Sequence, residues 1–193
     1  MGTISLLEID HAIFKFLNDL AGYSGFTDGV FVFFAEGIVY LMGAGLIFFV
    51  LQNKKNEAGY LSIFQSIISA FVSRLIIASI VREFYFRNRP FVSGIVNQLA
   101  YHNPLENSFP SGHASVMFAM AFSLLLTDFK LGVVYFILAL ISGTSRVIIG
   151  VHYPFDIIAG IFVAVISVIG TKFVFDFWMK ERLRKALRRL LKT

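Results

Sequence analysis

The chain has 193 residues, of which 57% are apolar and 16% aromatic, with a formal net charge of +5 and no cysteine. Its mean hydropathy of +0.76 exceeds what a water-soluble domain of this size can bury. These values exclude a soluble globular protein, a disulfide framework and thiolate chemistry. They predict an integral membrane protein with a single domain over residues 1–193.

The first 26 residues predict an amphipathic helix that lies in the membrane interface. Apolar residues recur along it at helical spacing: Ile9, Ile13, Phe16, Leu17 and Leu20. The segment lacks a basic start, and charged residues interrupt its apolar residues, so it is not expected to be a targeting segment.

About five later segments are apolar enough to cross a bilayer as helices. The predicted spans are residues 29–51, 60–81, 114–127, 131–149 and 155–178. Together they predict an all-α, polytopic membrane bundle over residues 29–178, followed by a basic tail over 180–193 with seven Lys or Arg residues. The tail is expected either to bind anionic lipid headgroups or to serve as a stop-transfer anchor.

Basic residues predict how the bundle is oriented, because short cytoplasmic loops are enriched in Lys and Arg. If the five spans alternate, several basic segments share one side: Lys54, Lys55, Lys130 and residues 180–193. That side is expected to be cytoplasmic. Residues 82–113 and 150–155 would then face outside, on the periplasmic or extracellular side of a multi-pass cell-membrane protein.

Other cationic residues fall on the outer side, although Lys and Arg are usually enriched on the cytoplasmic side. Arg82 and Arg89 are seven residues apart and would face the same way if the second span continued as a helix to Arg89. Further candidate residues of this outer patch lie at the outer ends of the later spans: Ser111, Gly112, His113, Arg146, His152 and Asp156. Such a patch suits a phosphate group, since guanidiniums and helix N-termini both bind oxyanions. For Ser111 alone, a helix-capping role is favoured over contact with a ligand.

Three stretches resemble the signature motifs of the type 2 phosphatidic acid phosphatase superfamily. They are REFYFRNRP over 82–90, PSGH over 110–113 and SRVIIGVHYPFD over 145–156. The first motif of that family usually opens with Lys, where this chain has Arg82, which keeps the charge but changes the donor geometry. The short chain and interfacial helix are most similar to the bacterial undecaprenyl-diphosphate phosphatases of that superfamily.

The resemblance implies a membrane phosphatase that forms a phosphohistidine. It implies His152 as the nucleophile, Asp156 as the group that orients it, and His113 as the acid and base. The transferring phosphate would be held by Arg82, Arg89, Ser111, Gly112 and Arg146. Undecaprenyl diphosphate is the expected substrate. Phosphatidic acid, phosphatidylglycerol phosphate, transfer to an acceptor other than water, and headgroup binding without turnover are the alternatives.

No cofactor and no nucleic-acid partner are expected. No metal ion is expected either, because the outer patch offers one well-placed carboxylate and magnesium sites use several. A zinc site formed by His113, His152 and Asp156 is the competing interpretation. Oligomeric state is not indicated by the sequence.

The remaining charged and histidine residues near the outer side are given lesser roles. Arg87 does not occupy a motif position and is expected to face headgroups or solvent, and His11 and His102 are expected to be bystanders. Glu36 and Arg74 both lie on the order of 10 Å below the outer surface. We expect them to pair across the first two spans; alternatively, Arg74 lines the floor of the phosphate site and Glu36 holds it in place.

Overall fold

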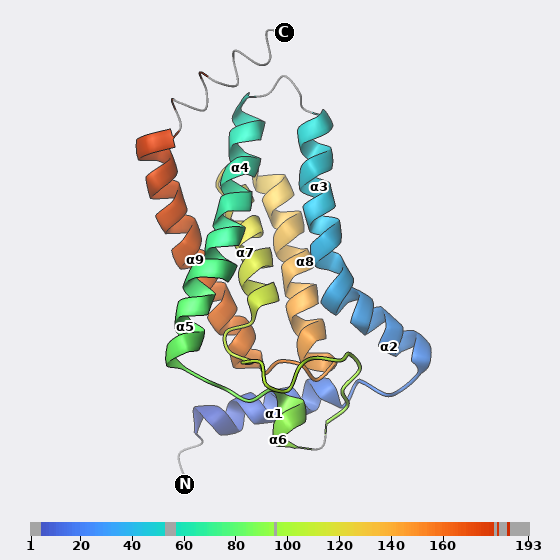
Figure 1. Ribbon diagram of the computed structural model, residues 1–193. Helices are drawn as coiled ribbons and strands as arrows, with labels where there is room; N and C mark the ends of the chain where they lie inside the picture. Colours follow the sequence, from blue (N-terminus) through green and yellow to red (C-terminus); the bar gives the residue numbers. More distant parts are fainter. Residues whose placement is uncertain (1–4, 53–56, 95, 180, 182–184, 186–193) are drawn as a thin grey trace.

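The computed structural model describes residues 5–52, 57–94, 96–179, 181 and 185, and helices are its only regular secondary structure over these residues (Figure 1). The predicted all-α class is therefore confirmed. In chain order, with π-helical segments labelled η, the elements are α1 (Leu6–Asn18), α2 (Gly25–Val32), η1 (Phe33–Gly37), α3 (Ile38–Gln52), α4 (Glu57–Phe71), η2 (Val72–Ile77), α5 (Ala78–Phe84), α6 (Pro90–Ser93), α7 (Gly112–Leu125), α8 (Phe129–Ile148), α9 (Pro154–Val174) and η3 (Phe175–Met179).

Four continuous helices among the described residues are long and apolar enough to cross a membrane. They cover Gly25–Gln52, Gly59–Phe84, Phe129–Ile148 and Pro154–Phe177. These ranges correspond to four of the five predicted spans, so the chain is a membrane protein. Most of the predicted basic tail, residues 180–193, and both Lys54 and Lys55 lie outside the described residues.

The third predicted span, 114–127, corresponds to α7, which has only 14 residues and is about 21 Å long. This helix packs in the middle of the bundle against α4, α8 and α9 (Figure 1). Small residues allow the close approach, since a Cβ atom on Gly160 of α9 would come within 2.8 Å of the Ala114 side chain. Ten of the 14 residues of α7 are buried, so most of its surface contacts other helices rather than lipid, and it can be shorter than the four long helices.

Helix α1 lies across one end of the bundle, beside α6 (Figure 1). It covers Leu6–Asn18, less than the predicted 1–26, and Ser5 caps it by accepting a hydrogen bond from the Glu8 amide at 3.2 Å. Four members of the predicted apolar stripe are exposed: Ile9, Ile13, Phe16 and Leu20. The residues that α1 turns toward the protein are Asp10, Phe14 and Asn18. The apolar face is therefore free to contact lipid while polar groups attach the helix to the bundle.

The second span ends at Phe84, three residues beyond the predicted 60–81, but it does not continue as a helix to Arg89. Helix α5 stops at Phe84, and Tyr85 is extended at φ −140° and ψ 114°, so no continuous helix joins Arg82 to Arg89. Asn107 stabilises this end, because its side-chain amide donates to the Tyr85 carbonyl at 2.6 Å. The prediction that helical periodicity aligns the two arginines is wrong, and a non-helical segment brings Arg89 to the site instead.

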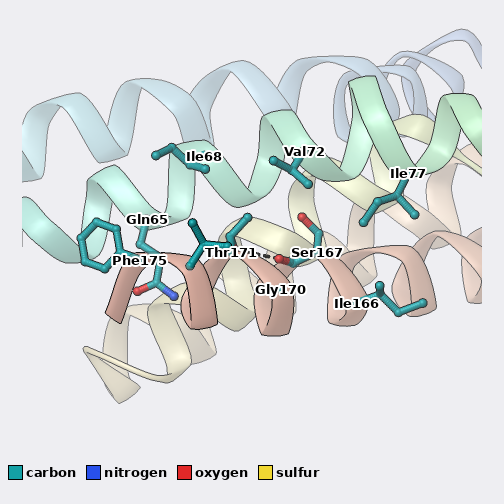
Figure 2. Close-up of a pocket in the computed structure, with 10 residues that line it drawn as sticks. Gln65, Ile68, Val72, Ile77, Ile166, Ser167, Gly170, Thr171 and Phe175 are labelled. Atoms are coloured by element: carbon teal, nitrogen blue, oxygen red, sulfur yellow. Dashed lines mark hydrogen bonds between the residues drawn. The ribbon is translucent and has the colours of Figure 1, made fainter. Parts of the chain in front are cut away.

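An apolar groove of about 410 Å³ lies between the α4–η2 helix and the α9–η3 helix (Figure 2). Two interhelical contacts hold these helices together, with Ser167 donating to the Ser69 carbonyl at 2.7 Å and the Ser69 and Thr171 hydroxyls 2.6 Å apart. None of the residues that line the groove belongs to the three sequence motifs. The groove is therefore distinct from the polar site described next.

Candidate functional site

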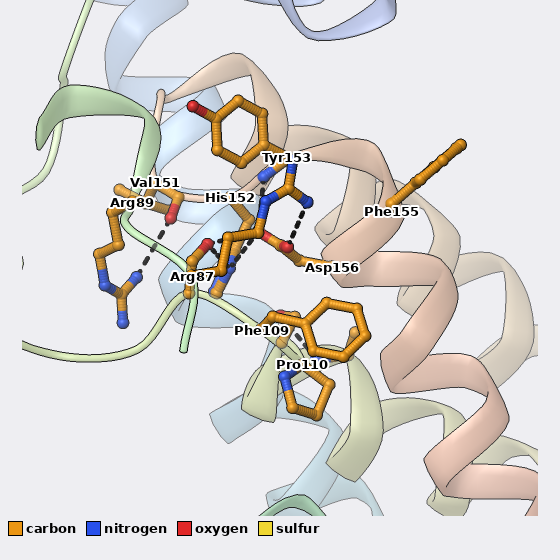
Figure 3. Close-up of polar contacts among 12 residues, drawn as sticks. Arg87, Arg89, Phe109, Pro110, Val151, His152, Tyr153, Phe155 and Asp156 are labelled. Carbon is orange, nitrogen blue, oxygen red and sulfur yellow. Dashed lines mark hydrogen bonds and ion pairs between the residues drawn. The ribbon is translucent and has the colours of Figure 1, made fainter. Parts of the chain in front are cut away.

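The residues of the three motifs come together at the end of the bundle that α1 and α6 cover (Figures 1 and 3). Asp156 is the centre of this arrangement and is fully buried in the first turn of α9. Its Oδ2 atom accepts hydrogen bonds from the Tyr153 amide at 2.8 Å and from the Ser108 hydroxyl. The helix start therefore fixes the carboxylate, as an acidic group near a helix N-terminus is stabilised there.

His152 precedes α9 and is only 2% exposed. Its Nδ1 atom lies 3.4 Å from Asp156 Oδ2 and 3.4 Å from the Ser108 hydroxyl. Burial lowers the pKa of His152 to about 3, against the opposing effect of the Asp156 carboxylate, so the imidazole is neutral at neutral pH. With Nδ1 directed at a carboxylate, the tautomer that has its lone pair on Nε2 is favoured.

Arg87 binds Asp156 from the other side. Its Nη1 donates to Asp156 Oδ1 at 2.8 Å, its Nη2 donates to Asp10 Oδ2, and its Cζ lies 3.9 Å from the Tyr153 ring centroid (Figure 3). Burial works against this charge, but Asp156 and Asp10 outweigh it and raise the pKa of Arg87. The expectation that Arg87 faces headgroups or solvent is wrong, because the extended chain after α5 turns its 12% exposed side chain inward.

Three further arginines surround the same site, and backbone carbonyls hold each of them. Arg82 donates to the Pro110 carbonyl at 2.8 Å, Arg89 to Val151 at 3.1 Å and Arg146 to Ala35 at 3.2 Å. Burial lowers the pKa of Arg89, and Glu106 at 3.4 Å partly offsets this. In each of the three side chains the Nε atom is buried and has no hydrogen-bond partner among the described residues. These donors can serve an oxyanion.

The N-terminus of α7 lies among these arginines. Ser111 is its N-cap and accepts from the Ala114 amide at 3.5 Å, while its own amide donates to the Asp156 carbonyl at 3.0 Å. The structure thus gives Ser111 the favoured capping role. Gly112 faces the Arg74 side chain so closely that a Cβ atom would come within 2.5 Å of Arg74 Nε. Gly112 therefore leaves room for a guanidinium.

Glu36 binds partners other than the predicted one. Its carboxylate lies 3.0 Å from Arg146 Nη1, 3.0 Å from His102 Nε2 and 3.6 Å from His113 Nε2. Among the ion pairs of the described residues there is no Glu36–Arg74 pair, so that prediction is wrong. The reason is that η1 packs against α8, which carries Arg146.

Both histidines expected to be bystanders contact residues of the site. His102 binds Glu36, and His11 stacks on Tyr153 with the ring centroids 5.0 Å apart. His113 is 32% exposed and is more open than His152. No group of three or more His, Asp or Glu side chains in the described part of the chain is placed to hold a metal ion, so the alternative zinc site is not formed.

Two residues of the site were missed from the sequence, Asp10 and Ser108. Asp10 is fully buried and also accepts from the Phe155 amide at 2.9 Å, yet in the sequence it is one of several charges that interrupt an amphipathic pattern. Ser108 lies two residues before Pro110, outside the motif as it was defined. For Arg87, the signal was its place in the same short segment as Arg82 and Arg89.

Fold and site together define an integral membrane protein with a buried, arginine-rich polar site at one end of its helices. Residues 59–180 match the PAP2 superfamily, and the chain belongs to that superfamily.

Curated relatives match over most of their length. The chain is 32% identical over 182 residues to the bacitracin transport permease protein BcrC of Bacillus licheniformis, covering 93% of this chain and 85% of the relative. It is 28% identical over 158 residues to the undecaprenyl-diphosphatase BcrC of Bacillus subtilis, covering 82% and 80%.

Solved structures share the fold. LpxE of Aquifex aeolicus superposes with a TM-score of 0.68 at 22% identity, over 88% of this chain and 98% of that one. A PAP2 type phosphatidylglycerolphosphate phosphatase of Bacillus subtilis superposes with a TM-score of 0.61 at 20% identity, over 91% and 88%. At these identities the likeness concerns the fold alone.

Proposed function

We propose that this protein is a membrane lipid phosphatase that hydrolyses undecaprenyl diphosphate to undecaprenyl phosphate and inorganic phosphate. The observation that carries the proposal is the set of three buried Nε donors on Arg82, Arg89 and Arg146, beside a neutral histidine and a helix N-terminus. Such donors suit the equatorial oxygens of a transferring phosphoryl group. The relative named undecaprenyl-diphosphatase, which matches 82% of this chain, supports the choice of substrate.

The reaction proceeds in two steps. In the first, Nε2 of His152 attacks the terminal phosphorus, and the bond from phosphorus to the bridging oxygen breaks. His113 protonates that oxygen as it leaves, and Asp156 stabilises the positive imidazole of His152. In the second step, His113 removes a proton from water, the water oxygen attacks phosphorus, and the bond between phosphorus and nitrogen breaks. Inorganic phosphate is released and His152 is neutral again.

The site also suits a substrate that stays in the bilayer. It lies at the end of apolar helices, so a headgroup can reach the arginines while its hydrocarbon chain remains among lipids. The basic residues of the loops support an orientation in which the site faces outside. The basic tail over 180–193 would then contact anionic lipids of the cytoplasmic leaflet.

The proposal is tested by phosphate release from purified protein in detergent with EDTA present. Undecaprenyl diphosphate, phosphatidic acid and phosphatidylglycerol phosphate are assayed in parallel, with His152→Ala as the inactive control. The highest kcat/KM is expected for the diphosphate. A preference for either monophosphate would reassign the substrate, and phosphate recovered on an added alcohol acceptor would indicate a phosphotransferase. Headgroup binding without turnover of any of the three would reject the enzyme.

A further inference from the structure

Arg74 approaches the site from inside the membrane. It lies in η2, and π-helical segments occur frequently at functional sites. A Cβ atom on Gly112 would come within 2.5 Å of Arg74 Nε and 2.8 Å of its Cζ, so the guanidinium lies against the N-terminus of α7. Arg74 therefore borders the region where Gly112 and the three motif arginines converge.

No carboxylate among the described residues pairs with the charge of Arg74. Its side chain forms no ion pair with any residue in the described ranges, and Glu36 is bound to Arg146, His102 and His113 instead. Two guanidiniums, those of Arg82 and Arg146, are near enough to repel it. A charge within a membrane span is costly unless it has a partner, so an anionic ligand is the group that suits this position.

Depth distinguishes Arg74 from the other arginines. Its Cα lies eight residues before that of Arg82, about 12 Å farther along the helix from the end of the bundle where His152 lies. In a lipid diphosphate, the terminal phosphate must reach His152, and the phosphate bonded to the lipid lies between it and the hydrocarbon chain. The membrane-side phosphate is thus the one next to Arg74.

We propose that Arg74 binds the phosphate that remains on the lipid and thereby gives the site its preference for diphosphates over monophosphates. This inference rests on the proposed function. A guanidinium suits the role because it can donate two parallel hydrogen bonds to one phosphate, and the amide groups at the start of α7 can bind the same oxygens.

The test uses two competitive inhibitors of phosphate release from undecaprenyl diphosphate. Methylene diphosphonate spans both phosphate positions, whereas inorganic phosphate occupies one. In Arg74→Gln, the inhibition constant for methylene diphosphonate should rise about tenfold more than that for inorganic phosphate, since a lost charged hydrogen bond costs roughly one decade or more in affinity. Arg74→Lys should lose less, because the charge remains.

Arg82→Gln is the matched control. Arg82 is assigned to the transferring phosphate, so this change should weaken both inhibitors by the same factor. Gly112→Ala is a second variant, because the added methyl group pushes the Arg74 guanidinium aside. It should therefore also raise the inhibition constant for methylene diphosphonate.

Equal loss of both inhibitors in Arg74→Gln, or no loss of either, overturns the assignment. The melting temperature of each variant in detergent distinguishes a change in inhibitor binding from misfolding. Arg74→Gln is expected to melt no lower than the wild type, because it breaks no ion pair of the described residues. A wild-type protein that releases no phosphate from undecaprenyl diphosphate would instead reject the proposed function, so the two failures are distinguishable.

Discussion

Asp10 of α1 and Asp156 of α9 bind the same guanidinium. Each carboxylate accepts a hydrogen bond from one terminal nitrogen of Arg87, and both carboxylates are fully buried. Because Asp156 also contacts His152, α1 is connected through Arg87 to the proposed nucleophile. The surface helix is thus part of the support of the site.

The first prediction concerns this shared ion pair. Arg87→Leu should destabilise the protein by about 3–5 kcal/mol, because it leaves two buried carboxylates without a counter-charge. The change is measured as a shift in unfolding midpoint in detergent. Adding Asp10→Asn to Arg87→Leu removes one of the stranded charges and should recover part of the loss. An unchanged midpoint in Arg87→Leu would contradict the ion pairs.

The second prediction separates the two histidines. His152→Ala should abolish turnover, whereas His113→Ala should retain slow turnover, lower by about 10²–10⁴-fold, because general acid catalysis typically contributes that much. The loss in His113→Ala should be smaller for a diphosphate than for phosphatidic acid, since a phosphate leaving group needs little protonation. Measured kcat values on both substrates check this. Full activity in His152→Ala would refute the nucleophile assignment.

The third prediction concerns pH. His152 has an ordinary pKa of 6.5, which burial lowers to about 3 in the folded protein. Between these values the unfolded chain binds a proton that the folded protein does not, so the contribution of His152 to stability falls as pH falls through this window. The melting temperature in detergent should therefore decrease from pH 7 to pH 4, and less steeply in His152→Gln. Identical slopes in the two proteins would contradict a neutral buried His152.

The fourth prediction concerns orientation. The chain has no native cysteine, so a single introduced thiol reports one position. Leu105→Cys, at a site that is 84% exposed in the loop before α7, should react with a membrane-impermeant maleimide in intact cells. Lys130→Cys, exposed at the start of α8, should react only after permeabilisation. The reverse pattern would place the site in the cytoplasm.

The sequence alone determined the membrane class, four of the spans and the residues of the three motifs. Span length and helix-stopping residues are local properties, so the composition of each segment predicts them without knowledge of the rest. The resemblance to a known family depended on short motifs, which are likewise local. His152, Asp156, Arg89 and Arg146 could therefore be named as site residues before any contact was known.

Only the tertiary structure decided which charges pair. Asn107 helps to end α5 by binding the Tyr85 carbonyl, and this contact from a distant loop overrides the helical periodicity that would have aligned Arg82 with Arg89. Arg87 then turns inward to Asp10 and Asp156, which lie 146 residues apart in the sequence. Glu36 binds Arg146 because η1 packs against α8. The energy of an ion pair depends on the distance between its charges, and helix packing sets that distance. Sequence spacing therefore could not predict these pairs.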